Sequence, residues 1–237
     1  METVNLQDFY SGGYFLLRAG RPDWPPPFGE LLPNGNLISL SDCISGRRLS
    51  VLWGWIPGNK EAALEFGIPE PRLAEFAAWC GTEYREWMDL VSMFYSPEAA
   101  RAFVRRFELN TNNLFLIGTG LPKELHKAWL EEEPDNEGIA RRVKQALPVD
   151  QSGEPLGYDV VSYSYQDFAH SWLCSGLEKD MNELFRIRAN HYGLIDTYAE
   201  AKQVNDWIAE DEGKGIRAEP EPYDFWLLLS YPLEVGT

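Results

Sequence analysis

The chain has 237 residues, of which 44% are hydrophobic, and a formal net charge of −16 from 37 acidic and 21 basic side chains. Its 12 Phe, 11 Tyr and 9 Trp predict a folded protein, because disordered chains with this much charge are poor in aromatic residues. A surface this acidic repels phosphate backbones and anionic lipid headgroups, so we expect neither nucleic acid nor a membrane as a partner.

The first residues, METVNLQDFY, have neither the basic segment nor the continuous apolar segment of a signal peptide. No apolar run approaches the roughly 18 residues that span a bilayer. We therefore expect a cytoplasmic protein. Cys43, Cys80 and Cys174 are widely spaced and odd in number, a pattern that is not typical of a disulfide framework or a zinc site. We expect no metal and no cofactor.

The first 57 residues alternate between apolar and polar positions and predict β structure. We expect strands at 14–18, 36–40 and 48–56. The segment RPDWPPPF, residues 21–28, is rich in proline and predicts a rigid connector packed by Trp24 and Phe28. A proline-rich ligand for an aromatic groove is the alternative interpretation.

From Pro71 the apolar period changes to about 3.6 residues, which predicts a long amphipathic helix that extends to Phe94. Ser96 and Pro97 are typical of the start of a second helix. A short strand at 114–117 follows, and we interpret Gly118-Thr119-Gly120 as a turn that closes it.

Two short helices are expected at 125–130 and 139–147, separated by a solvated acidic loop at 131–138. Residues 151–157 form the best linker candidate. After it we expect a strand at 158–165, a helix at 168–185, a turn at 190–193, a helix at 198–209 and a strand at 225–231. Thr197 and Glu200 form a capping box before the last helix. The apolar run FWLLLSY predicts a central strand.

This succession of elements predicts an α+β fold in which a mixed or antiparallel sheet is flanked by helices. We expect a single domain over residues 1–237. A division into an N-terminal part at 1–150 and a C-terminal strand-helix-helix-strand unit at 151–237 is the alternative.

The negative charge is concentrated in the second half of the chain. Residues 1–120 hold 14 acidic and 10 basic side chains, and residues 121–237 hold 23 acidic and 11 basic ones. This asymmetry favours a protein that binds a basic partner. The expected contact residues are Glu178, Asp180, Glu183, Asp206, Glu210, Asp211 and Glu212, with Trp172 and Trp207 as aromatic anchors. Core packing is the alternative role for each tryptophan.

The cluster DFAHSWLC contains the residues best suited to catalysis. On a helix at 168–185, His170 and Cys174 would share a face, and Glu178 would extend it by one turn. Asp167 is a further acid in the same cluster. An imidazole beside a thiol can generate a nucleophile. A buried structural cysteine is the alternative interpretation.

The main functional prediction is a non-catalytic, acidic protein-binding module. In composition alone the chain resembles bacterial immunity proteins, which neutralise a cognate toxin. The most specific form of the functional prediction is therefore an immunity-type inhibitor of a basic partner or toxin. The alternative prediction is an enzyme, a hydrolase or transferase, with an aromatic-lined pocket near His170 and Cys174. A structural or scaffold subunit is a third reading.

Overall fold

The computed structural model describes residues 4–18, 37–41, 44, 47–49, 59–88, 92–132, 138–163, 168–174, 176–210 and 222–233. Its strands are β1 (Phe9–Arg18), β2 (Arg47–Arg48), β3 (Leu114–Pro122), β4 (Glu154–Tyr163), β5 (Phe168–Ser171) and β6 (Tyr223–Tyr231). Its α-helices are α3 (Lys60–Phe66), α4 (Leu73–Thr82), α5 (Pro97–Arg106), α6 (Lys123–Glu132), α7 (Gly138–Lys144), α8 (Leu177–Phe185) and α9 (Tyr198–Glu210). Short 3₁₀ turns lie at Leu6–Asp8, Glu70–Arg72 and Tyr84–Glu86.

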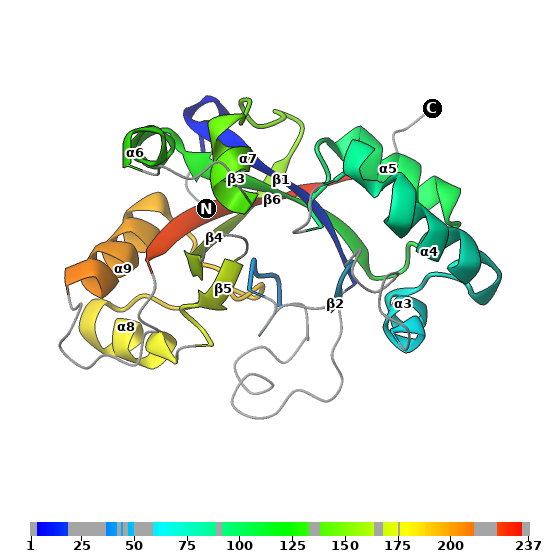
Figure 1. Ribbon diagram of the computed structural model, residues 1–237. Helices are drawn as coiled ribbons and strands as arrows, with labels where there is room; N and C mark the ends of the chain where they lie inside the picture. The colour runs from blue at the N-terminus through cyan, green and yellow to red at the C-terminus, as the bar shows by residue number, and fades with distance from the viewer. Residues whose placement is uncertain are drawn as a thin grey trace.

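The strands form one six-stranded sheet in the order β2-β1-β3-β6-β4-β5, and every neighbouring pair is antiparallel. The predicted α+β class is confirmed, and the sheet is the antiparallel variant. The last strand lies between β3 and β4, so its predicted central position is also confirmed. Strands from both halves of the chain therefore share one sheet, shown in Figure 1.

Both faces of this sheet are covered, which explains why its central strands are almost wholly apolar. In β6, Phe225, Leu227 and Leu229 belong to one core cluster, while Trp226 and Leu228 belong to the other. The first cluster includes side chains of α4, α5, α8 and α9. The second includes side chains of α6 and α7.

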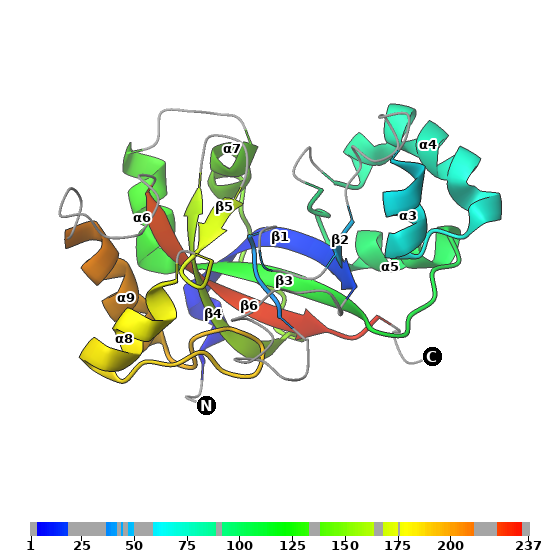
Figure 2. The ribbon, with the colours of Figure 1, turned by 90° about the horizontal axis from the view of Figure 1, so that it is seen from below.

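The helices on the first face form two groups. Figures 1 and 2 place α3, α4 and α5 at one end of the sheet, and α8 and α9 at the opposite end. In the first group, the rings of Phe76, Trp79, Phe103 and Phe107 are packed together and almost completely buried. The Trp79 and Phe103 ring centroids, for example, are 5.0 Å apart.

Two predicted helix starts are confirmed. The Ser96 hydroxyl accepts a hydrogen bond from the Ala99 amide at 3.1 Å, and Pro97 is the first residue of α5. The Thr197 hydroxyl likewise accepts from the Glu200 amide at 3.2 Å and donates to the Glu200 carboxylate at 2.8 Å. Both polar side chains satisfy amides that the first turn of a helix leaves without a partner.

The prediction of one helix from Pro71 to Phe94 is wrong beyond Thr82, where α4 ends. The apolar spacing continues, but Met88 and Phe94 form a β-bridge with each other, and Phe94 forms another with Tyr14. The Phe94 amide donates to the Tyr14 carbonyl at 2.6 Å. Pairing with the edge of β1 therefore replaces the last helical turns.

The predicted turn at Gly118 and Gly120 is also wrong, because both glycines lie inside β3. A Cβ atom at Gly118 would come within 2.5 Å of the Tyr231 ring and 3.0 Å of the Tyr14 ring. Glycine is required there by the close approach of two aromatic rings, and not by a change of chain direction.

The prediction of one helix over 168–185 is wrong in its first half. Residues Phe168–Ser171 form β5, in which Ser171 pairs with Val161 of β4. A turn follows, and α8 begins only at Leu177, after Gly176 in a left-handed conformation with φ of 73°. The linker candidate at 151–157 overlaps a strand as well, since β4 begins at Glu154.

Several predictions fall on residues outside the described part of the chain. These are the proline-rich connector with Trp24 and Phe28, Cys43, the strand residues 50–56, most of the acidic loop at 131–138, Asp167, Asp211 and Glu212. The division of the chain into domains stays a prediction.

Candidate functional site

Helix α9 has one buried face and one open face. Ala201, Val204 and Ile208 are buried against the sheet, at spacings of three and four residues. On the open side, Lys202, Gln203, Asp206 and Glu210 are exposed, together with Ala199. Tyr198 and Trp207 lie between the two faces and are half-buried.

Helix α8 brings a third aromatic side chain to this open face. Leu177 and Met181 are fully buried, and Phe185 follows at the same spacing of four residues. The helix ends directly after Phe185, because Arg186 adopts a left-handed conformation with φ of 65°. Phe185 is therefore half-buried at the helix end and packs against the core beside α9.

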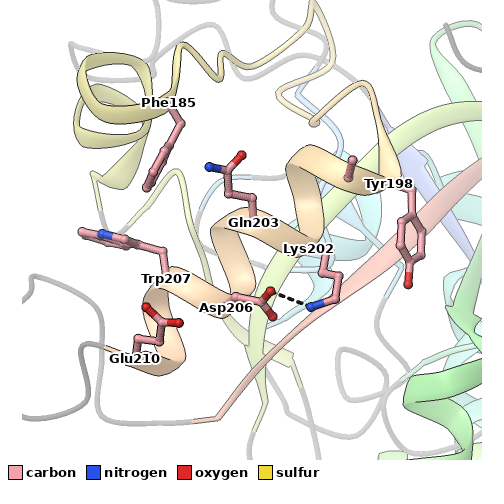
Figure 3. Close-up of a pocket in the computed structure, with 8 residues that line it drawn as sticks. Phe185, Tyr198, Lys202, Gln203, Asp206, Trp207 and Glu210 are labelled. Atoms are coloured by element: carbon pink, nitrogen blue, oxygen red, sulfur yellow. Dashed lines mark hydrogen bonds and ion pairs between the residues drawn. The ribbon is translucent and has the colours of Figure 1, made fainter.

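Together the two helices line an open hollow of about 490 Å³. Figure 3 shows Phe185 of α8 and Trp207 of α9 pointing toward one another, with the Glu210 carboxylate beside Trp207. The lining residues are Phe185, Tyr198, Ala199, Lys202, Gln203, Asp206, Trp207 and Glu210. We call this hollow and its lining residues the α8–α9 surface.

The α8–α9 surface has a surplus of negative charge. Each of the two helices carries three carboxylates and one lysine. The lysines are engaged within their own helices, since Lys202 contacts Asp206 at 2.5 Å and Lys179 contacts Glu183 at 3.9 Å. Among the described residues, no ion pair or hydrogen bond engages the side chain of Glu178, Asp180 or Glu210.

The structure brings together part of the set of predicted contact residues. Asp206, Trp207 and Glu210 line the hollow, and Glu178, Asp180 and Glu183 lie on the neighbouring helix α8. Trp172 does not belong to this surface: its side chain is 0% exposed, so it is a core residue and is not available to anchor a partner. The burial follows from the position of Trp172 directly after the edge strand β5, beneath α8.

Sequence reasoning missed the other five lining residues of this surface, which are Phe185, Tyr198, Ala199, Lys202 and Gln203. A signal for Phe185 was present in the spacing of Leu177, Met181 and Phe185, which places three apolar side chains on one side of α8. The erroneous extension of that helix back to Phe168 hid the signal. Gln203 carries no sequence signal, because an exposed glutamine on a helix is ordinary.

His170 and Cys174 come together by a different route from the predicted one. His170 lies in β5 and Cys174 lies in the turn that follows, so they do not share a helical face. Their side chains nevertheless meet, with the Cys174 Sγ atom 3.6 Å from His170 Nδ1. Glu178 is in the first turn of α8, and no hydrogen bond or ion pair joins it to either residue within the described chain. The predicted Cys-His-Glu set is therefore not assembled.

A buried carboxylate close to this pair was not anticipated. Asp159 of β4 is 0% exposed and accepts hydrogen bonds from the Ser39 hydroxyl at 2.7 Å, the Leu40 amide at 2.8 Å and the Ser171 hydroxyl at 2.9 Å. Burial raises the pKa of Asp159, although the three hydrogen bonds act in the opposite direction. The carboxylate holds residues 39–40 and β5 against β4.

Neither a membrane span nor a metal centre is found in the described residues. No helix there combines the length and the apolar character that crossing a membrane requires. No group of three or more His, Cys, Asp or Glu side chains is arranged there to hold a metal ion.

Comparisons of the chain with protein-family models, with curated proteins and with solved structures gave no match.

Proposed function

We propose that the protein is a non-catalytic binding module whose α8–α9 surface takes a basic segment of another protein. The observation that carries this proposal is the pair of half-buried rings, Phe185 and Trp207, that face one another across an open hollow with carboxylates at its edge. Inhibition of a basic toxin, as by an immunity protein, is the most specific form of this function.

The aromatic rings favour a cationic side chain as the central contact. A guanidinium or ammonium group over the face of a tryptophan is attracted by about 0.5–2 kcal/mol, depending on how far water is excluded. Trp207 is held by core contacts on one side, so little side-chain entropy is lost when a partner covers its other side. Tryptophan and arginine are also the residues most enriched at energetically dominant interface positions.

The carboxylates favour the same partner. Glu210 beside Trp207 has no cation partner among the described residues, so a guanidinium placed on the indole would gain a charge-assisted hydrogen bond. The net charge of −16 would speed the encounter with a basic protein at low salt.

The open shape of the hollow favours a macromolecular partner over a small substrate. Five of its eight lining residues are exposed, whereas a small-molecule site buries most of the surface of its ligand. A partner that lies along α9 could cover Trp207, Asp206 and Glu210 in a single contact.

The proposal can be tested with the full chain and a fluorescein-labelled peptide of alternating arginine and glycine. We expect fluorescence anisotropy to report binding that weakens as salt rises. Trp207→Ala should weaken it by about tenfold, because tryptophans at interface centres contribute on this scale. Glu210→Gln should weaken it by a smaller factor and reduce the salt dependence.

Tyr95→Ala is the matched control, because Tyr95 is an exposed aromatic residue, 55% accessible, that does not line the α8–α9 surface. It should bind the peptide as the wild type does. A peptide of alternating glutamate and glycine should not bind. Equal binding by wild type and Trp207→Ala, or no binding of the arginine peptide, would refute the proposal.

A further inference from the structure

We infer that Cys174 is a nucleophilic thiol, activated by His170 and open to small, soft electrophiles. The inference rests on the geometry of these two side chains, and it is independent of the binding function proposed for α8 and α9. The chemistry that we infer for this pair is covalent modification of the Cys174 thiol.

The backbone holds the two side chains together through β5 and its following turn. The His170 amide donates to the Ser162 hydroxyl of β4 at 2.9 Å, which fixes the backbone of His170 at the sheet edge. The Leu173 amide donates to the Ser171 hydroxyl at 3.3 Å, and the Gly176 amide donates to the Leu173 carbonyl at 3.0 Å. These bonds form a compact turn that presents the thiol to the imidazole.

Two polar atoms of the described residues lie close to the Cys174 thiol. Its sulfur lies 3.1 Å from the Ser171 carbonyl oxygen and 3.6 Å from His170 Nδ1. The carbonyl stabilises only the protonated thiol, because an oxygen with partial negative charge repels a thiolate. The imidazole can take the proton and then stabilise the thiolate as a cation. Reactivity at Cys174 should therefore depend on His170 to an unusual degree.

Accessibility separates Cys174 from the other described cysteine. Cys174 is partly exposed, while Cys80 is buried within the α4–α5 core at 0% exposure. Among the described residues, the acids nearest to the thiol in the sequence are Glu178 and Asp180, in the first turn of α8. Neither is within hydrogen-bonding distance of His170 or Cys174 in the described chain. Within the described chain, the titratable side chain in direct contact with the thiol is the His170 imidazole, and the Asp159 carboxylate is bonded to the neighbouring Ser171 hydroxyl.

The expected reaction with iodoacetamide is a simple displacement. The Cys174 proton moves to His170 Nδ1, and the thiolate sulfur attacks the carbon that bears iodine. A sulfur–carbon bond forms, the carbon–iodine bond breaks, and iodide leaves with the bonding electron pair. The product is a thioether, and no oxidant or reductant is consumed.

The test is a pH series of iodoacetamide alkylation on the folded full chain, with peptide mass mapping to follow Cys43, Cys80 and Cys174 separately. We expect Cys174 to react with a midpoint below about 8.5, the value of an ordinary thiol. Cys80 should be protected until the chain unfolds. At pH 7, His170→Gln should slow the alkylation of Cys174 by about tenfold or more and move its midpoint upward.

His170→Phe is the second variant, because it keeps a planar ring but has no nitrogen, and thermal melts would establish that each variant is folded. It should react as slowly as His170→Gln. A wild-type midpoint at or above that of an ordinary thiol overturns the inference without any variant. Equal rates in the wild type and in both folded variants overturn it as well.

Discussion

The two helix groups at the ends of the sheet use the same residue types in opposite ways. In α4 and α5, Phe76, Trp79 and Phe103 are fully buried and contact one another. In α8 and α9, Phe185 and Trp207 are half-buried and face an open hollow. Aromatic content by itself therefore does not identify a binding surface. The burial of each aromatic side chain decides whether it can contact a partner.

The two helix groups also differ in the sign of their charges and in how these charges are paired. The α5 helix carries one glutamate and three arginines, whereas α8 and α9 each carry three acids and one lysine. Arg106 contacts Glu75 at 3.1 Å and Glu83 at 2.7 Å, so charges near α4 and α5 are joined across elements. Near α8 and α9 the ion pairs are local, and Glu210 is left without one among the described residues. Among the described residues, Arg106 thus joins two different elements, whereas the ion pairs of α8 and α9 each stay within one helix.

The strongest way to break this comparison is to remove one tryptophan from each end. Trp79→Ala should lower the free energy of unfolding by about 3–5 kcal/mol, because it opens a large cavity in a packed core. Trp207→Ala should cost less, since this side chain is only partly buried and its removal opens a smaller cavity. Chemical denaturation measures both. An equal loss would show that Trp207 is a core residue and that the two ends do not differ.

A second prediction concerns Asp159, which joins β4 to β5 and to residues 39–40. Asp159→Ala should cost about 2–3 kcal/mol, because the Leu40 amide and two hydroxyls lose a buried acceptor. Asp159→Asn is the matched control and should cost less, since its oxygen still accepts from Leu40 while the serine hydroxyls can reorient. Similar losses in the two variants would contradict the proposed role of the hydrogen bonds.

The same residue gives a pH dependence with a defined sign. Burial raises the pKa of folded Asp159 above its ordinary value of 3.8, so the folded state holds this proton more tightly than the unfolded state. Its contribution to stability is present below pH 3.8 and is lost as pH rises through the folded pKa. Denaturation from pH 4 upward should therefore show the wild type losing stability relative to Asp159→Asn. The opposite trend would contradict the assignment.

The smallest expected effect concerns the paired acids near α4. Hydrogen bonds from Arg106 lower the pKa of Glu83 below its ordinary value of 4.5, so its contribution is present above pH 4.5 and is lost as pH falls through the folded pKa. Glu83→Gln should remove that acid-sensitive part of the unfolding curve. Glu210→Gln, at the other end, is the control and should leave it unchanged. A similar change in acid sensitivity for Glu83→Gln and Glu210→Gln would show that the ion pair with Arg106 does not set Glu83 apart.

The sequence predicted the fold where a single local signal decides the outcome. Ser96 and Thr197 cap helices as expected, and the apolar run of β6 lies at the centre of the sheet. It failed where long-range pairing overrides a local period. Phe94 leaves the helical pattern to pair with Tyr14, and Phe168–Ser171 joins β4 although its apolar spacing also suits a helix.

The candidate site was predicted in outline from charge and tryptophan content. Asp206, Trp207 and Glu210 do lie together, because a three- and four-residue spacing on a helix is a reliable guide. Trp172 takes its alternative role, that of a core residue; sequence spacing does not decide between the two roles, because burial depends on what covers an edge strand. The contact of His170 with Cys174 was anticipated on a helix, and it occurs instead through a strand and a turn.

The most direct test of the α8–α9 surface is an NMR titration of the ¹⁵N-labelled full chain with the unlabelled arginine–glycine peptide. We predict saturable amide shifts that concentrate between Leu177 and Glu210, together with a shift of the Trp207 indole, and their loss in Trp207→Ala. Shifts spread evenly over acidic residues at both ends of the molecule, and unchanged in that variant, would contradict the account.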